Sequence, residues 1–410
     1  MRCLALVIVA WSLVAFAPGV ARAVLKTTPD ATWQTDGRVR AVTYAHGVVY
    51  LGGSFTHVSP PGGGSSVVRN HAAAFDADTG ALLRWNPNVN EAVSALAVDG
   101  STVYLGGSFS SVGGKDRSHI AAVTLGGAVT SWNPGANGPV NAIARDSSGG
   151  LYLGGSFTSL DGKRRLRVAH VRADGSATGW KPSVTETSGT CPPSCTPMVF
   201  SLKLSRDKSA LYIGGRFDLV NGTVRRSAAP VSTDSGALLQ WNPTVVSPHP
   251  KKAAQVGRVL DMAVSSTRVY LCGDFWSVGG AVSANLASVD PVTGNRDSSF
   301  NANTDGGSPA CRFREGLLII GGHFIRAGST KGWVSPGAGQ KSTLTGAGTA
   351  KRIHLAAFDA LSGAIADWNP GANSTLGVHA MATRRAGLAV GGDFTVIGGR
   401  HQEGFAQFSD

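Results

Sequence analysis

The 410-residue sequence has few charged residues and very little glutamate. Asp, Glu, Lys and Arg make up 15% of the chain, and glutamate occurs only at Glu91, Glu186, Glu315 and Glu403. Long surface helices need more charge than this, and almost no segment has apolar residues three and four positions apart. The sequence therefore argues against a helical protein, and its 55 glycines favour a turn-rich β protein.

Motifs for catalysis and metal binding are also missing. No HExxH, HxH or GxSxG occurs, so the usual anchors of zinc peptidases and serine hydrolases are absent. The segment "DADTG" (76–80) lacks the glycine and the terminal glutamate of an EF-hand loop. His71, His119 and His354 stand where strands begin, which favours packing or loop contacts. We expect no catalytic residue, no metal and no cofactor.

Long apolar runs occur only at the N-terminus. Arg2 precedes "CLALVIVAWSLVAFA" (3–17), and "ARA" at Ala21–Ala23 is typical of a cleavage site. We expect residues 1–23 to be a signal peptide, with a secreted or surface-located mature chain, 24–410, that has no membrane anchor. Losing Arg2 and Arg22 lowers the formal charge from +12 to +10. Despite this charge, nucleic acid is a poor partner for an exported chain.

Cysteine is scarce, and four cysteines remain once Cys3 is removed. An even number in an exported chain favours disulfides, and four cysteines allow three pairings. "CPPSC" is neither a CxxC pair nor a zinc knuckle. The pairing we favour closes a small loop through Cys191–Cys195 and joins neighbouring repeats through Cys272–Cys311.

The chain is built on a repeat. "VYLGGSF" occurs at Val49–Phe55 and again at Val103–Phe109, and near-copies bring the number of glycine–phenylalanine signatures to seven, spaced 48 to 70 residues apart. Such a period is typical of repeat architectures. One unit contains four short strands, near Val93–Asp99, 103–112, 119–125 and Ala128–Trp132, which matches a propeller blade.

The two ends of the chain predict how the repeats close. The last copy stops after its third strand, whereas the N-terminal "ATWQTDG" carries an isolated Trp33 where a fourth strand should end. We therefore predict an all-β fold: a single seven-bladed β-propeller of four-stranded blades over 24–410, its ring closed by an N-terminal strand that completes the last blade. Paired glycines should mark bulges or close backbone approaches, and each signature phenylalanine should fill the space between blades.

The repeat, "VYLGGSF-x-x-VGG-x-x-R-x-x-hAAh-D-x-x-TGAL-x-x-WNP", resembles the delta-60 repeat family. That family comprises secreted bacterial β-propeller repeats of unknown function, with relatives in fungal cell-cortex marker proteins. The resemblance covers essentially the whole mature chain and implies a propeller in an extracytoplasmic or surface setting, with no catalytic residues. The fifth unit departs from the pattern, because Cys272 replaces the first glycine and Phe300 replaces the tryptophan.

Long insertions fall only in connections that leave one face of the predicted ring, those between second and third strands and those between units. They are Ser59–Val68, Ser183–Pro197, Thr244–Gly257 and Ile325–Arg352. In repeat proteins such a face is often the binding face. This face is basic, so we predict a secreted, non-enzymatic binding or scaffold propeller that contacts an anionic cell-envelope polymer or an extracellular protein. The candidate binding residues are Lys251, Lys252, Lys331, Trp333, Lys341, Lys351 and Arg352.

An arginine also precedes the third strand of most units. It stands at Arg69, Arg117, Arg165, Arg225 and Arg352, with Ser283 and Gln402 in the remaining two units. A ring of guanidinium groups is able to hold an anionic polymer. A residue present in nearly every unit more often serves the unit itself, and we favour stacking on the "WNP" tryptophan or bonding to a loop carbonyl.

Two enzymatic alternatives remain. A polysaccharide-active enzyme would need two carboxylates facing each other across a sugar, and Asp218, Asp274 and Asp393 are the recurring candidates outside turns. "AFDADTGALLRW" (74–85) also resembles the repeats of quinoprotein dehydrogenases, which would require a quinone cofactor. The adjacent cysteines expected from that resemblance are missing.

Overall fold

The computed structural model describes residues 25–187, 196–246, 257–329, 333–334, 343–344 and 348–410. Every regular element in these ranges is a β-strand, so the prediction of an all-β chain is confirmed. The described part of the chain holds no helix of the length and hydropathy that crossing a bilayer requires.

Among the described strands, seven three-stranded antiparallel sheets share one topology, and we call them the repeat sheets. We name each by its inner strand. The inner strands are β2 (Val39–Ala45), β7 (Val93–Asp99), β12 (Val140–Arg145), β18 (Met198–Leu204), β24 (Arg258–Val264), β30 (Ala310–Arg314) and β37 (Val378–Arg384). The middle strands are β3 (Val48–Gly53), β8 (Thr102–Gly107), β13 (Leu151–Gly155), β19 (Ala210–Arg216), β25 (Val269–Asp274), β31 (Leu317–Gly321) and β38 (Gly387–Gly392). The outer strands are β6 (Ala72–Asp76), β11 (Ile120–Thr124), β16 (Val168–Val171), β22 (Ala228–Ser232), β28 (Leu286–Val289), β36 (Leu355–Asp359) and β41 (Phe405–Ser409).

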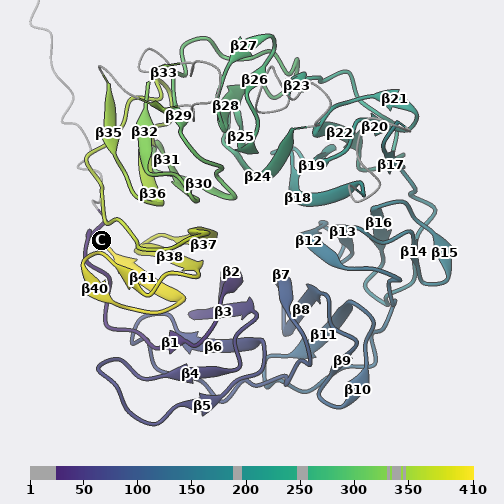
Figure 1. Cartoon of the computed structure of the whole chain (residues 1–410). Coiled ribbons are helices and arrows are strands. Elements are labelled where there is room, and N and C mark those ends of the chain that lie inside the picture. Colours follow the sequence, from purple (N-terminus) through teal and green to yellow (C-terminus); the bar gives the residue numbers. More distant parts are fainter. Residues whose placement is uncertain (1–24, 188–195, 247–256, 330–332, 335–342, 345–347) are drawn as a thin grey trace, which may run out of the picture.

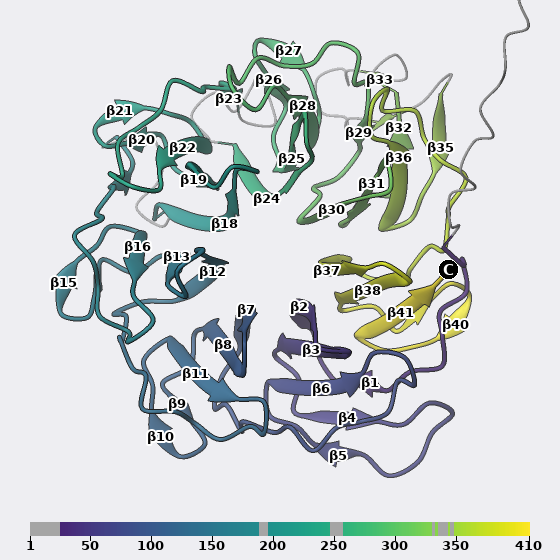
Figure 2. The ribbon, with the colours of Figure 1, turned by 180° about the vertical axis from the view of Figure 1, so that it is seen from behind.

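The repeat sheets lie around a common centre with their inner strands innermost, as both views of the ribbon show (Figures 1 and 2). Each inner strand contacts the inner strand of the next sheet along the chain, and β37 contacts β2. Many small antiparallel sheets in such an arrangement fit a β-propeller.

The predicted fourth strand of each unit is much shorter than five residues. In the β7 sheet it pairs with the outer strand through a single bridge, Val123 to Val129. The Thr130 amide and hydroxyl both donate to the Ala122 carbonyl, each at 3.0 Å. The Thr130 carbonyl accepts a hydrogen bond from the Arg117 guanidinium instead of from the outer strand, so the ladder ends there.

Residues near the N-terminus run along the free edge of β41. The amides of Lys26 and Asp30 donate to the carbonyls of Ser409 and Gln407, at 3.0 and 2.8 Å. The segment therefore lies where the other repeat sheets carry their short fourth strand.

The paired glycines of each signature make room for two different neighbours. A Cβ on Gly52 would lie 2.5 Å from a methyl carbon of Val93 in the next sheet. A Cβ on Gly53 would lie 2.1 Å from the carbonyl oxygen of Arg38 in the same sheet. Real Cβ atoms do not approach other atoms this closely, so the prediction that the glycines mark close approaches is confirmed.

The signature phenylalanines fill the space between neighbouring sheets, as predicted. All seven are at most 1% exposed, and they are Phe55, Phe109, Phe157, Phe217, Phe275, Phe324 and Phe394. The buried clusters around them combine residues of adjacent sheets; one joins Val39 and Leu51 to Ala389 and Phe405. The core is thus divided into layers between sheets, each stabilised by burial of aromatic and aliphatic surface.

One layer is joined covalently. Cys272 on β25 and Cys311 on β30 form a disulfide across two neighbouring sheets, with 6.4 Å between their Cα atoms, so this predicted pair is confirmed. The predicted partners Cys191 and Cys195 lie outside the described residues. Cys272 replaces a signature glycine, and the fully buried Ser308 stands where the facing sheet otherwise carries a valine such as Val259. The smaller serine makes room for the cysteine side chain.

Short strands lie on one side of the repeat sheets. We call this side the insertion face. It is the side on which the connections between middle and outer strands and those between consecutive sheets lie, and it carries the predicted insertions as far as they are described. Its strands are β1 (Gln34–Thr35), β4 (His57–Ser59), β5 (Val67–Val68), β9 (Ser111–Val112), β10 (Lys115–Asp116), β14 (Ser159–Leu160), β15 (Lys163–Arg164), β17 (Val184–Thr185), β20 (Leu219–Val220), β21 (Thr223–Val224), β23 (Val245–Val246), β26 (Ser277–Val278), β27 (Ala281–Val282), β29 (Asn303–Thr304), β32 (Arg326–Gly328), β33 (Trp333–Val334), β34 (Thr343–Leu344), β35 (Thr349–Lys351), β39 (Val396–Ile397) and β40 (Arg400–His401).

Candidate functional site

A β-bulge near the start of the inner strands aims one side chain of each toward the centre. The register of β2 against β3 slips between Val39 and Ala41, and the same slip occurs in five other inner strands. A bulge leaves one residue unpaired and turns its side chain out of the ladder. Pro309 precedes β30 at the equivalent position. The seven residues, which we call the bulge ring, are Arg40, Ser94, Asn141, Phe200, Leu260, Pro309 and His379.

The bulge ring separates two cavities on the central axis. The outer one, the mouth cavity, has a volume of about 540 Å³ and opens at the insertion face, where the inner strands begin. Besides the bulge ring it is lined by Arg38, Arg258, Asp274 and His323. Arg258 and Asp274 form an ion pair with each other. Arg38 lies 3.7 Å from the Asp393 carboxylate, so Arg40 is the lining cation that leaves the mouth with an excess of positive charge.

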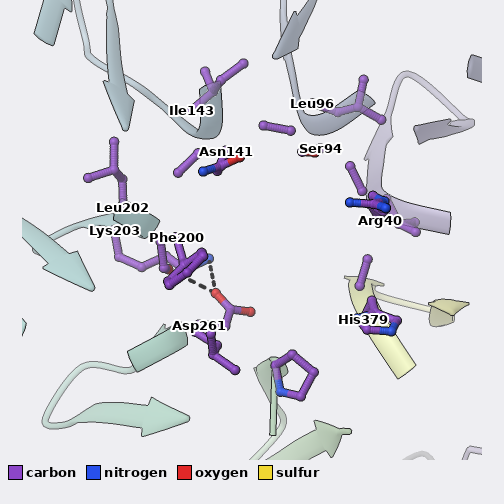
Figure 3. Close-up of a pocket in the computed structure, with 18 of the residues that line it drawn as sticks. Arg40, Ser94, Leu96, Asn141, Ile143, Phe200, Leu202, Lys203, Asp261 and His379 are labelled. Atoms are coloured by element: carbon purple, nitrogen blue, oxygen red, sulfur yellow. Dashed lines mark hydrogen bonds and ion pairs between the residues drawn. The ribbon is translucent and has the colours of Figure 1, made fainter. Parts of the chain in front are cut away.

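The inner cavity lies deeper along the same strands and has a volume of about 180 Å³. Figure 3 shows Lys203 and Asp261 on one side of it and Arg40 and His379 on the other. Residues of all seven inner strands, or of the segments just before them, line it, among them Arg312.

A buried carboxylate holds the wall of the inner cavity together. Asp261 Oδ1 lies 3.2 Å from Lys203 Nζ and accepts a hydrogen bond from the Ser201 hydroxyl at 3.1 Å. Its Oδ2 binds the Arg312 guanidinium and the amide of Cys311. Burial opposes ionisation of this carboxyl, but Lys203 and Arg312 outweigh it and lower its pKa to about 2. Asp261 therefore joins β18, β24 and β30 as a charged group.

The opposite wall is cationic and lacks a carboxylate partner among the described contacts. Arg40 Nε donates to the Ser54 hydroxyl at 3.1 Å. Burial and the nearby Arg38 both lower the pKa of Arg40. His379 lies beside them, and burial, then Arg38, lower its pKa to about 4. The imidazole is therefore neutral at pH 7, and its buried Nε2 has no hydrogen-bond partner in the described structure.

Most of the basic residues predicted from the insertions lie outside the described residues. These are Lys251, Lys252, Lys331 and Lys341. Trp333 begins β33, which pairs with β34. Lys351 ends β35 and is exposed, whereas the Arg352 guanidinium donates to the carbonyls of Lys351 and Ala366, at 3.1 and 2.9 Å. The structure thus gives Arg352 a role within its own unit, and a binding role for the other residues stays a prediction.

The repeated arginines serve their own units, as we expected. Arg69 donates to the Leu83 carbonyl at 2.9 Å, and Arg117 and Arg165 donate to the carbonyls of Thr130 and Thr178. Each of these carbonyls belongs to the short fourth segment. The arginine therefore satisfies a backbone acceptor that a longer strand would have paired.

Most of the residues weighed for metal binding or hydrolysis also have structural partners. His71 and His354 contact the carbonyls of Gly53 and Gly322, and the described residues hold no group of three or more potential metal ligands. Asp274 pairs with an arginine, and Asp393 Oδ2 lies 3.7 Å from Arg38 Nη2. The remaining candidate, Asp218, is buried and accepts a hydrogen bond from the Thr187 amide at 2.7 Å.

Sequence reasoning missed the bulge ring and the inner cavity. One pattern in the sequence could have indicated them. In most units a valine and a small or polar residue flank one position that differs from unit to unit, as Val39 and Ala41 flank Arg40. A position that varies between two buried, repeated ones is free of the packing between sheets. Such positions in a ring of repeats face the axis or the solvent, and the sequence alone does not say which.

No protein-family model matches the sequence, and no curated protein gives a significant match. Solved structures do match. The WD40 β-propeller domain of Doa1 matches with a TM-score of 0.51 and 11% identity, over 93% of this chain and 97% of that one. The computationally designed Ika8 protein matches with a TM-score of 0.48 and 11% identity, over 93% of this chain and 100% of that one. At such low identity the similarity to the Doa1 domain shows the fold alone: this chain is a β-propeller.

Proposed function

We propose that the seven repeat sheets are the blades of one propeller and that residues 25–33 close its ring. Three contacts between the N-terminal segment and the last two sheets support closure. The Lys26 amide bonds β41, the Trp368 indole donates to the Lys26 carbonyl at 3.0 Å, and the Gln402 amide donates to the carbonyls of Thr32 and Trp33, each at 3.3 Å. Gln402 stands where other units carry the repeated arginine, and here it binds the closing segment instead.

We further propose that the protein is secreted and binds an anionic cell-envelope polymer through its insertion face, without catalysing a reaction. The observation that carries this proposal is the charge of the mouth cavity, where Arg38 and Arg258 pair with carboxylates and Arg40 has no carboxylate partner among the described contacts. A cavity with an excess of one sign of charge concentrates ligands of the opposite sign. The lysines that the sequence predicts for the insertions would add to this positive charge.

Two observations support the extracellular setting. The first 23 residues have the pattern of a signal peptide. The Cys272–Cys311 disulfide is the kind of bond that persists in oxidising compartments. An acidic extracellular protein is the alternative partner that the same cationic face would accept.

The proposal is tested by mixing the mature protein, residues 24–410, with isolated envelopes of the producing cell and measuring the pelleted fraction. One variant carries glutamine at four positions that the sequence assigns to the insertion face, Lys251, Lys252, Lys341 and Lys351. A matched control carries glutamine at four exposed positions in turns on the opposite side, Arg172, Arg206, Lys208 and Arg385. Both variants lose the same charge, so a difference between them reports on the face and not on net charge.

We expect the insertion-face variant to lose most of its envelope binding and the control to keep it. Binding that survives protease treatment of the envelopes assigns the partner to a polymer, and binding that disappears assigns it to a protein. Equal binding of both variants would contradict the proposal.

A further inference from the structure

We propose that the inner cavity is a binding site for a compact anion that carries carboxylate or phosphate groups. Its described lining includes no residue of the lysine-bearing insertions, and its existence does not depend on the envelope ligand. Three cationic side chains line it, Arg40, Lys203 and Arg312, and Asp261 is the acidic one among the lining residues. With His379 neutral, the lining carries two more positive than negative charges.

The contacts of the charged side chains indicate that the excess positive charge is available to a ligand. Asp261 is fully used by Lys203, Arg312, Ser201 and two backbone amides. Arg312 makes its described contacts to Asp261 and to the Cys311 carbonyl through Nη1 alone. Its Nη2 is therefore left for another acceptor.

Across the cavity, Arg40 has its Nε on the Ser54 hydroxyl, and no described carboxylate pairs with its guanidinium. A planar guanidinium binds carboxylate and phosphate through two parallel hydrogen bonds. Arg40 stands on a bulge, which holds its side chain toward the axis. Figure 3 shows it across the open space from Lys203.

His379 supplies a second, independent feature. Its Nε2 is buried and has no partner in the described structure, although the residue lines both cavities. A buried nitrogen without a partner costs free energy unless a ligand or water satisfies it. The charged and titratable groups that face this imidazole are Arg38, Arg40, Asp393 and His323. An anion beside Arg40 would offset the arginines and favour the imidazolium.

The test uses purified protein without envelopes, so its failure is distinguishable from failure of the envelope proposal. Inorganic phosphate and succinate are titrated separately by calorimetry, against sodium chloride at matched ionic strength. In parallel, the pKa of His379 is measured by NMR with and without each anion. The variants are Arg40→Gln, Arg40→Lys and the control Arg84→Gln, which alters an exposed arginine outside both cavities.

We expect at least one of the two anions to bind and to raise the pKa of His379 from about 4 by about one unit, because an adjacent opposite charge favours the imidazolium. Arg40→Gln should weaken binding about tenfold or more, since a hydrogen bond between charged groups is lost. Arg40→Lys should keep part of the affinity, and Arg84→Gln all of it. Binding of phosphate alone identifies a phosphate site, and binding of succinate alone identifies a carboxylate site. If neither anion binds, or if Arg40→Gln binds as tightly as the wild type, the proposal is wrong.

Discussion

Gly391 of the last repeat sheet lies against Val39 of the first, so a side chain added at Gly391 should strain the layer between these two sheets. A Cβ at position 391 would lie 2.4 Å from Val39 Cγ1 and 3.1 Å from Val42 Cγ2. Carbon atoms pack best at about 3.5–4.0 Å, so one of the groups must move by about 1 Å. Overpacking of this kind costs about 1–3 kcal/mol, and we expect Gly391→Ala to lower the free energy of unfolding by that amount.

A second substitution, at Val39, tests whether the clash with this residue causes the loss of stability. Val39 is fully buried, and Val39→Ala alone should cost about 2 kcal/mol because it leaves a cavity. In the double variant the Val39 methyl group that lies closest to the new Cβ is gone. The Val39 Cβ, 2.9 Å from the new atom, and Val42 Cγ2, 3.1 Å from it, remain, so the relief is partial. The double variant should then be about 1 kcal/mol more stable than the sum of the single effects predicts.

The assay is urea unfolding followed by tryptophan fluorescence, with the denaturant slope compared across all variants. The control pairs Gly391→Ala with Val259→Ala, an equally buried valine of the β24 sheet, and these effects should add within about 0.5 kcal/mol. If the Gly391 and Val39 effects also add, the last and first sheets are not packed as the structure places them, and the closure argument fails.

Three further predictions concern other residues. Replacing Cys272 and Cys311 by serine removes a link between residues 39 positions apart and should cost about 4 kcal/mol of unfolding free energy, measured against the wild type with and without reductant. The Asp261 carboxyl has a folded pKa of about 2, below its ordinary 3.8, so its contribution of about 2 kcal/mol is complete above pH 4 and is lost as the pH falls toward 2. Asp261→Asn should remove that part of the pH dependence of the melting temperature, and an unchanged acid profile would refute the ionised clamp. Arg117→Met leaves the Thr130 carbonyl without its donor and should cost about 1–3 kcal/mol while envelope binding stays at the wild-type level. A loss of binding in this variant, with stability unchanged, would instead support the arginine-ring interpretation.

The parts of the fold that depend on packing between repeats were readable in the sequence. Gly52 and Phe55 recur because every layer between sheets presents the same restricted space, and identical constraints select identical residues. The one unit in which a cysteine replaces the first signature glycine follows the same rule, because Cys272 fits where the facing residue is the small Ser308. The repeated residues thus predicted the packing between sheets more clearly than alternation of apolar and polar residues did.

The features that escaped prediction depend on backbone geometry or on single side chains. The fourth strand was expected to span the five residues of "AVTSW", but the Arg117 guanidinium takes the Thr130 carbonyl that a longer ladder would use. The bulge that turns Arg40 toward the axis is a slip in the register between β2 and β3, and no residue pattern predicts such a slip. The ionic contact between Lys203 and Asp261 joins different repeats through residues that no other repeat shares.

The central claim, that a cationic face binds an anionic polymer of the cell envelope, is tested most directly by co-sedimentation of the mature protein with isolated envelopes across a salt series. Salt screens charges that are exposed to solvent, with a Debye length that falls from about 30 Å at 0.01 M to about 3 Å at 1 M. We predict binding at low salt that weakens steadily as the salt concentration rises. Absence of binding at every salt concentration, or binding that is indifferent to salt, would contradict the account.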